Sequence, residues 1–171
     1  MRSLYEKILW PGNLIDCFSL GKEQNLTQRG DVMASMERER KLLQQSVAIV
    51  AAIPVAAGLY GVLFGQALTG DAVSISAESH FRFLSGLLLG IGLCFWSTLP
   101  SIEIRTGRFR LLTLLVVIGG LGRLVGLGLT GLPSLFMIGG LIIELVVAPA
   151  LCLWQTRVAN LYAEEYGVAE T

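Results

Sequence analysis

Five ionisable residues stand out because they lie within or directly beside long apolar runs. Arg123 and Glu144 each interrupt a run of Leu, Val, Ile and Gly, and Glu78, His80 and Arg82 surround the beginning of an earlier run. A charge in a membrane span is costly unless it pairs with an opposite charge or faces a polar cavity. These residue types therefore predict ion pairing and anion binding.

The depths of Arg123 and Glu144 in their spans are similar. Arg123 lies about 10 Å from the end of its span and Glu144 about 14 Å from the start of the next, at the rise of an α-helix. The spans are joined by a tight turn, Gly131-Leu132-Pro133-Ser134, and helices joined in this way are antiparallel neighbours. We therefore predict an ion pair, buried within the bundle, between Arg123 and Glu144.

Arg82 enters from the same side, about 4 Å inside its span, so we expect it to join a cluster with Arg123 and Glu144. Two guanidinium groups and one carboxylate leave a positive charge that can bind a lipid phosphate, or a carboxylate or phosphate on a small ligand. Glu78 and His80 flank this cluster at the water interface. In the alternative interpretation, the ion pair only fastens the helices and Arg82 extends toward the lipid headgroups.

Small residues share helical faces with these charges. Gly86 and Gly90 follow Arg82 at intervals of four residues, and Gly119 and Gly126 lie on the arginine face of the third span. Small residues allow membrane helices to approach closely. We expect the closest helix contacts on these faces.

The composition indicates a membrane protein. The chain has 171 residues, of which 53% are hydrophobic and 15% charged, whereas soluble domains average about 25% charged residues. The net charge of zero argues against a nucleic-acid-binding protein. Cys17, Cys94 and Cys152 have no metal-ligand spacing. We expect no catalytic residues, no metal and no cofactor.

The hydrophobic runs predict an all-α membrane protein, an antiparallel four-transmembrane-helix bundle with a polar N-terminal extension. About 20 residues cross the hydrocarbon core, and four spans of this length are expected, at 42–64, 80–99, 111–129 and 135–154. Together they form a transmembrane domain over residues 42–157, followed by a cytoplasmic tail over residues 158–171.

Residues 1–41 differ from the rest of the chain in being polar. We expect a cytoplasmic extension that is partly disordered or lies on the membrane surface, and Met33 or Met36 remains an alternative start. No secretory signal peptide is evident, so the first span is expected to direct insertion.

Basic residues predict the orientation. The loops at 66–79 and 130–134 contain no Lys or Arg, and the positive-inside rule then places both termini in the cytoplasm. The basic residues on the other side are Arg38, Arg40, Lys41, Arg105, Arg108, Arg110 and Arg157.

Three motifs carry a resemblance to a known family. They are the run Ser79-His80-Phe81-Arg82-Phe83-Leu84-Ser85-Gly86, the run Gly119-Gly120-Leu121-Gly122-Arg123-Leu124, and Glu144-Leu145-Val146 followed by Pro149 and Leu153-Trp154-Gln155. Over residues 43–160 the chain resembles the bacterial integral membrane family called domain of unknown function 4345. The resemblance implies a four-helix protein of the bacterial inner membrane with His80, Arg82, Arg123 and Glu144 as its polar positions. It implies no activity, substrate or cofactor.

These patterns favour a non-enzymatic integral membrane protein. Its expected partners are membrane lipid, with an anionic lipid or small anion at the cluster, and a second copy or other subunits of a membrane complex. One alternative is a small transporter or channel that uses Glu144. A second alternative is a membrane enzyme acting on a lipid or quinone, for which only Ser79, Ser85 and His80 are candidate reactive groups.

Overall fold

The computed structural model describes residues 12–66, 74–131 and 135–167. The chain forms two units, Met1–Arg38 and Glu39–Thr171, and helix α1 (Gly12–Phe64) contributes to both. The remaining elements of the second unit are α2 (Ile75–Thr98), the short 3₁₀ helix η1 (Leu99–Ser101), α3 (Thr106–Thr130), α4 (Leu135–Ile142), the π-helical turn η2 (Ile143–Val147) and α5 (Ala148–Tyr166).

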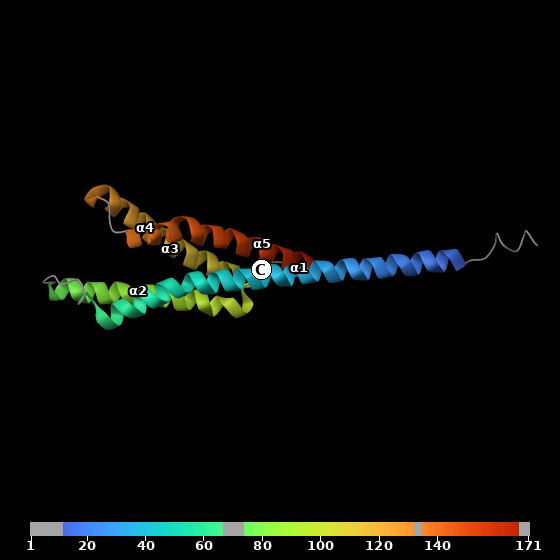
Figure 1. The fold of residues 1–171 in the computed structure, drawn as a ribbon, viewed down its shortest axis with the longest axis horizontal. Helices are drawn as coiled ribbons and strands as arrows, with labels where there is room; N and C mark the ends of the chain where they lie inside the picture. Colours follow the sequence, from blue (N-terminus) through green and yellow to red (C-terminus); the bar gives the residue numbers. More distant parts are fainter. Residues whose placement is uncertain (1–11, 67–73, 132–134, 168–171) are drawn as a thin grey trace, which may run out of the picture. The chain divides into compact units, whose positions relative to one another are not determined.

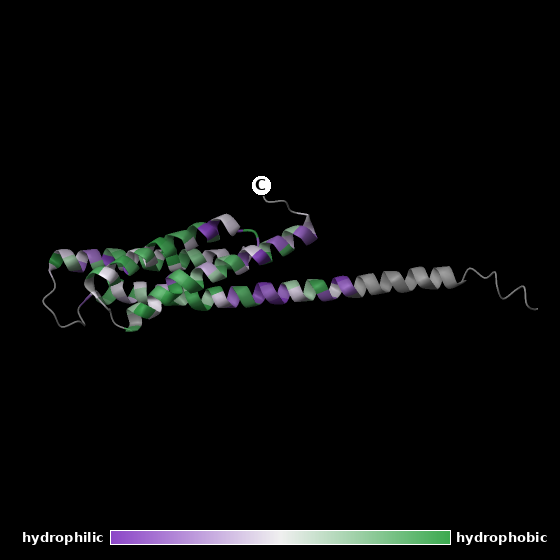
Figure 2. Cartoon of the chain, turned by 90° about the horizontal axis from the view of Figure 1, so that it is seen from above, coloured by the Kyte–Doolittle hydropathy of each residue, from purple (hydrophilic) through white to green (hydrophobic). Residues whose placement is uncertain are grey.

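The prediction of an all-α bundle of four membrane-spanning helices is confirmed. Among the described residues, four helices are long and apolar enough to cross a membrane: Gln28–Phe64, Ile75–Ser101, Thr106–Leu129 and Met137–Tyr166. Hydrophobic residues dominate the helices of the second unit (Figure 2). The lengths and compositions of these helices indicate a membrane protein.

The N-terminal segment differs from the sequence expectation. Residues 12–41, which we expected to be partly disordered or interfacial, are helical as part of α1. Extending an existing helix by one residue costs far less than nucleating a new one, and this segment is rich in Glu, Gln, Lys, Arg, Leu and Met, which favour helix. Residues 1–11 lie outside the described part of the chain.

The core of the second unit lies at one end of the bundle. This end carries most of the basic residues, and we call it the basic end; the opposite end, at Gln66 and Gly131, is the distal end. The core consists of Leu43, Val47, Ile102, Phe109 and Val158. Ile102 and Phe109 come from the expected connection at 101–110, and Val158 comes from the expected tail, so both segments contribute buried side chains to the core. Both segments form helical turns whose apolar side chains pack inward.

Hydrogen bonds reinforce the basic end. Gln155 is fully buried, and its Nε2 donates to the Ile102 carbonyl at 2.7 Å and to the Thr106 hydroxyl at 3.0 Å. Arg40 Nε donates to Glu103 at 3.0 Å. The basic end is therefore held together by buried apolar contacts and by polar bonds that join α1 and α5 to the turn before α3 and to its first residue.

Helices α1 and α2 lie side by side (Figure 1) and approach closely at glycines. A Cβ atom at Gly58 would lie 2.5 Å from the Leu89 nitrogen, and one at Gly92 would lie 2.6 Å from Val55 Cγ2. Gly90, which we expected in this contact, has no atom within 4 Å of an added Cβ. The face that α2 turns to α1 is therefore rotated away from the predicted one.

These contacts predict that Gly58→Ala lowers the free energy of unfolding, whereas Gly90→Ala does not. The added methyl at position 58 meets backbone atoms that cannot move aside, and such overpacking costs about 1–3 kcal/mol. At position 90 the methyl enters open space, and the change should stay within about 0.5 kcal/mol. Thermal unfolding of both variants in a mild detergent measures the difference. Equal stability of the two variants would contradict this α1–α2 packing.

Candidate anion-binding site

Arg123 and Glu144 meet across the contact between α3 and η2. Arg123 Nε lies 3.1 Å from Glu144 Oε2, so the predicted pairing of these two residues is confirmed. Their contact places the two residues at the same height in the bundle, as expected from their positions in the two spans.

The pair is not buried within the protein, contrary to the sequence prediction. The Arg123 side chain is 41% exposed and the Glu144 side chain 15% exposed. The neighbours of Arg123 on α3 include Gly119, Gly122 and Gly126, which have no side chains to cover its guanidinium. The carboxylate is thus enclosed, while the guanidinium is open on one side.

Glu144 lies on a π-helical turn that the sequence did not predict. The Ala148 N–H donates to the Ile143 carbonyl, a bond over five residues. Pro149 follows at once; proline has no N–H, and its ring collides with the carbonyl four residues earlier in a regular helix. The wider turn relieves this collision, and it changes the rotation of α4 relative to α5.

Gly120 allows η2 to approach α3. A Cβ atom at this position would lie 3.0 Å from Glu144 Cβ and 2.8 Å from Leu145 Cδ2. We expected Gly119 and Gly126 in this role, but neither has an atom within 4 Å of an added Cβ. The two spans are therefore neighbours as predicted, but α3 contacts η2 through Gly120 instead of Gly119.

The contact between Arg123 and Glu144 is ionic without a well-aligned hydrogen bond. Glu144 Oε2 is inaccessible and accepts no hydrogen bond from any described residue, although Arg123 Nε is 3.1 Å away. The N–H therefore does not point at this oxygen. The carboxylate keeps an acceptor position that is not satisfied, which is costly away from water.

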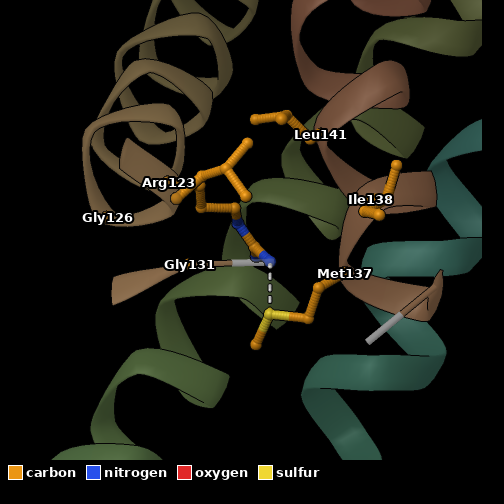
Figure 3. Close-up of a pocket in the computed structure, with 7 residues that line it drawn as sticks. Arg123, Gly126, Gly131, Met137, Ile138 and Leu141 are labelled. Carbon is orange, nitrogen blue, oxygen red and sulfur yellow. Dashed lines mark hydrogen bonds between the residues drawn. The ribbon is translucent and has the colours of Figure 1, made fainter. Parts of the chain in front are cut away.

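A cavity of about 270 Å³ adjoins the guanidinium. Figure 3 shows Arg123 extending from α3 toward Met137 on α4, and its Nη1 lies 4.0 Å from the Met137 sulfur, a weak acceptor. Among the described residues, the lining comprises Arg123, Gly126, Leu127, Gly131, Met137, Ile138 and Leu141, and Arg123 is the charged one. The cavity thus combines an apolar wall with a single cation.

Arg82 forms a separate pair with Glu78, so the expected cluster of Arg82, Arg123 and Glu144 does not form. Arg82 Nε donates to Glu78 Oε1 at 2.7 Å, and its Nη1 donates to the Val62 carbonyl at 2.6 Å. Glu78 Oε2 accepts the Gln66 N–H at 3.0 Å. These bonds satisfy backbone groups at the end of α1 that the helix leaves unpaired. The spacing of four residues between Glu78 and Arg82 was a visible signal for their pairing.

The end of α1, beside Glu78 and Arg82, requires a glycine. Gly65 ends α1 with φ +60°, a left-handed conformation that glycine adopts without strain. A Cβ at Gly65 would collide with Glu78 and Arg82. Helix α1 therefore ends at Gly65, and Glu78 and Arg82 of α2 bond to the backbone at this end.

The other candidate residues do not join either pair. His80 is exposed, with its ring 6.4 Å from that of Phe83. Ser79 is exposed and Ser85 is buried. No group of three or more His, Cys, Asp or Glu residues that could hold a metal ion occurs within residues 12–66, 74–131 and 135–167.

A comparison with known families assigns most of the chain to one family. The family described as "Domain of unknown function (DUF4345)" matches residues 42–155. The chain belongs to this family. The match covers more than half of the chain. It contains the Arg82–Glu78 pair, the Arg123–Glu144 pair and the glycine contacts of α1, α2 and α3. No curated protein and no solved structure matches the chain.

A double-mutant cycle tests the Arg123–Glu144 contact. Each of Arg123→Gln and Glu144→Gln leaves an unpaired charge in the span, so both single variants should be destabilised. The double variant removes both charges, and its loss should be smaller than the sum by on the order of 1 kcal/mol. Thermal unfolding in detergent gives the three values. Strictly additive losses would show that the two side chains do not interact.

The Arg82 contacts predict a loss of stability in Arg82→Met that is absent in Arg108→Met. Arg82→Met removes the donor to the Val62 carbonyl and to Glu78 Oε1. Arg108 is exposed and forms no hydrogen bond or ion pair with the described residues. We expect a lower melting temperature for the first variant alone. Equal melting temperatures would mean that Arg82 does not hold the end of α1.

Proposed function

We propose that the protein is a non-enzymatic integral membrane protein of the bacterial inner membrane that binds an anionic amphiphile through Arg123. The observation that carries the proposal is the apolar cavity beside a partly exposed guanidinium. An apolar pocket with one or a few polar groups is the usual form of a small-molecule site.

The geometry of Arg123 indicates how an anion binds. Glu144 lies on the Nε side of the guanidinium, and among the described residues Nη1 has only the weak sulfur acceptor of Met137. A carboxylate or phosphate can therefore approach end-on and accept from Nη1 and Nη2 together, the bidentate arrangement that guanidinium groups favour. The two bonds would add to the Glu144 contact without competing for the same N–H.

The size and polarity of the cavity limit the rest of the ligand. A volume of about 270 Å³ is slightly below the range of about 300–1,000 Å³ for small-molecule sites. It suits an anionic group and the first few carbons of a chain, which would contact Leu127, Ile138 and Leu141. The remainder of an acyl chain would lie along the outside of α3 and α4.

The distribution of charge supports an orientation with both termini in the cytoplasm. Arg40, Arg105, Arg108, Arg110 and Arg157 lie at the basic end, whereas the distal loops contain no Lys or Arg. By the positive-inside rule, the basic end faces the cytoplasm. The cavity of Arg123 would then be open to the outer leaflet.

The test is the binding of dodecyl phosphate to the purified full-length chain in a neutral maltoside detergent, measured by native mass spectrometry. We expect Arg123→Gln to weaken binding by roughly tenfold to a hundredfold, because a hydrogen bond to a charged group contributes about 1.5–3 kcal/mol. Arg108→Gln at the basic end is the matched control and should bind as the wild type does.

Two further ligands identify the source of the affinity. Dodecanol should bind weakly because it has no charge, and inorganic phosphate should bind weakly because it has no chain. Equal binding of dodecyl phosphate and dodecanol, or of the Arg123→Gln and Arg108→Gln variants, would exclude the proposed site.

A further inference from the structure

The charges around the cavity are balanced before any ligand binds. Arg123 and Glu144 are the only Asp, Glu, Lys, Arg or His residues between positions 111 and 156, and they form one ion pair. A bound anion therefore changes the net charge of this region from zero to minus one. An uncompensated charge in a membrane span is costly, so the anion needs a compensating positive charge.

The apolar parts of α1 and α2 supply no compensating charge. Positions 42–65 of α1 and 83–98 of α2 contain no Asp, Glu, Lys, Arg or His. Arg82 and Glu78 neutralise each other at the end of α1, and His80 is exposed beside Phe83.

Glu144 is placed to accept the compensating charge. Its Oε2 is enclosed, accepts no hydrogen bond from the described residues, and lies 3.1 Å from Arg123 Nε. Protonation removes the charge of the carboxylate and leaves Arg123 to the incoming anion. A protonated carboxyl group can also donate a hydrogen bond, so it ceases to repel a neighbouring anionic oxygen.

We propose that the site binds its anion together with one proton, which is taken up by Glu144. This inference rests on the proposed function. In the free protein, ionised Glu144 neutralises Arg123; in the complex, the anion neutralises Arg123 and Glu144 carries the proton as a neutral carboxyl group. The proton comes from water, and the total charge of the site remains zero. Anion and proton thus bind as a neutral pair.

The inference predicts that anion affinity falls as the pH rises. While Glu144 is ionised in the free protein and protonated in the complex, each unit of pH lowers the affinity about tenfold, because one proton is consumed in binding. The probe is decanesulfonate, the anion of a strong acid. It remains ionised from about pH 5 to about pH 9, so its own titration does not contribute.

Titration calorimetry of the wild-type chain in two buffers of different ionisation enthalpy gives the number of protons taken up. We expect about one proton per decanesulfonate bound. Glu144→Gln resembles the protonated carboxyl group, and it should bind decanesulfonate at least as tightly with no proton uptake and no dependence on pH. His80→Gln, which removes the single histidine of the sequence, is the control and should retain the uptake.

The possible outcomes separate the two proposals. Decanesulfonate binding without proton uptake by the wild type, or uptake that is lost in His80→Gln, overturns the role of Glu144 and leaves the anion site intact. Failure of the wild type to bind decanesulfonate and dodecyl phosphate overturns both proposals. Because the two-buffer measurement needs only the wild-type chain, the result does not depend on whether Glu144→Gln folds.

Discussion

The contact between Arg123 and Glu144 is the interaction on which the distal half of this protein depends. Lipid offers no water to solvate either charge, so each must be neutralised by the other. The approach of η2 to α3 at Gly120 makes that contact possible. A single glycine and a single turn of wider helix thus determine whether two charged residues are tolerated in otherwise apolar spans.

The two ends of the bundle are stabilised in different ways. At the basic end, apolar side chains of α1, α3 and α5 form a core around Phe109, and Gln155 ties α5 to the connection after α2. Toward the distal end, the contacts are close glycine approaches and ion pairs at the helix surfaces. This division places the cavity of Arg123 away from the tightly packed core, where a ligand can enter without disturbing it.

The sequence was sufficient to predict the four spans, because length and hydropathy determine them, and to predict the Arg123–Glu144 pair, because the turn after α3 sets the heights of both residues. It did not predict which glycines make contacts, since a rotation of one position exchanges Gly119 for Gly120. It also missed the π-helical turn at Glu144, which depends on how the chain accommodates Pro149. Arg82 was assigned to the wrong partner although Glu78 stands four residues before it, a spacing that favours pairing on one helix. Its second partner, the Val62 carbonyl, is a backbone group that a pattern of side chains does not reveal.

The pairing of Arg82 with Glu78 has a consequence for how the chain enters the membrane. Both residues belong to the first hairpin, and the other two charges of the spans belong to the second. Each hairpin is therefore electrically neutral within its apolar part and needs no ion from its neighbour. Neither hairpin therefore has to wait for the other in order to cover a charge when it enters lipid.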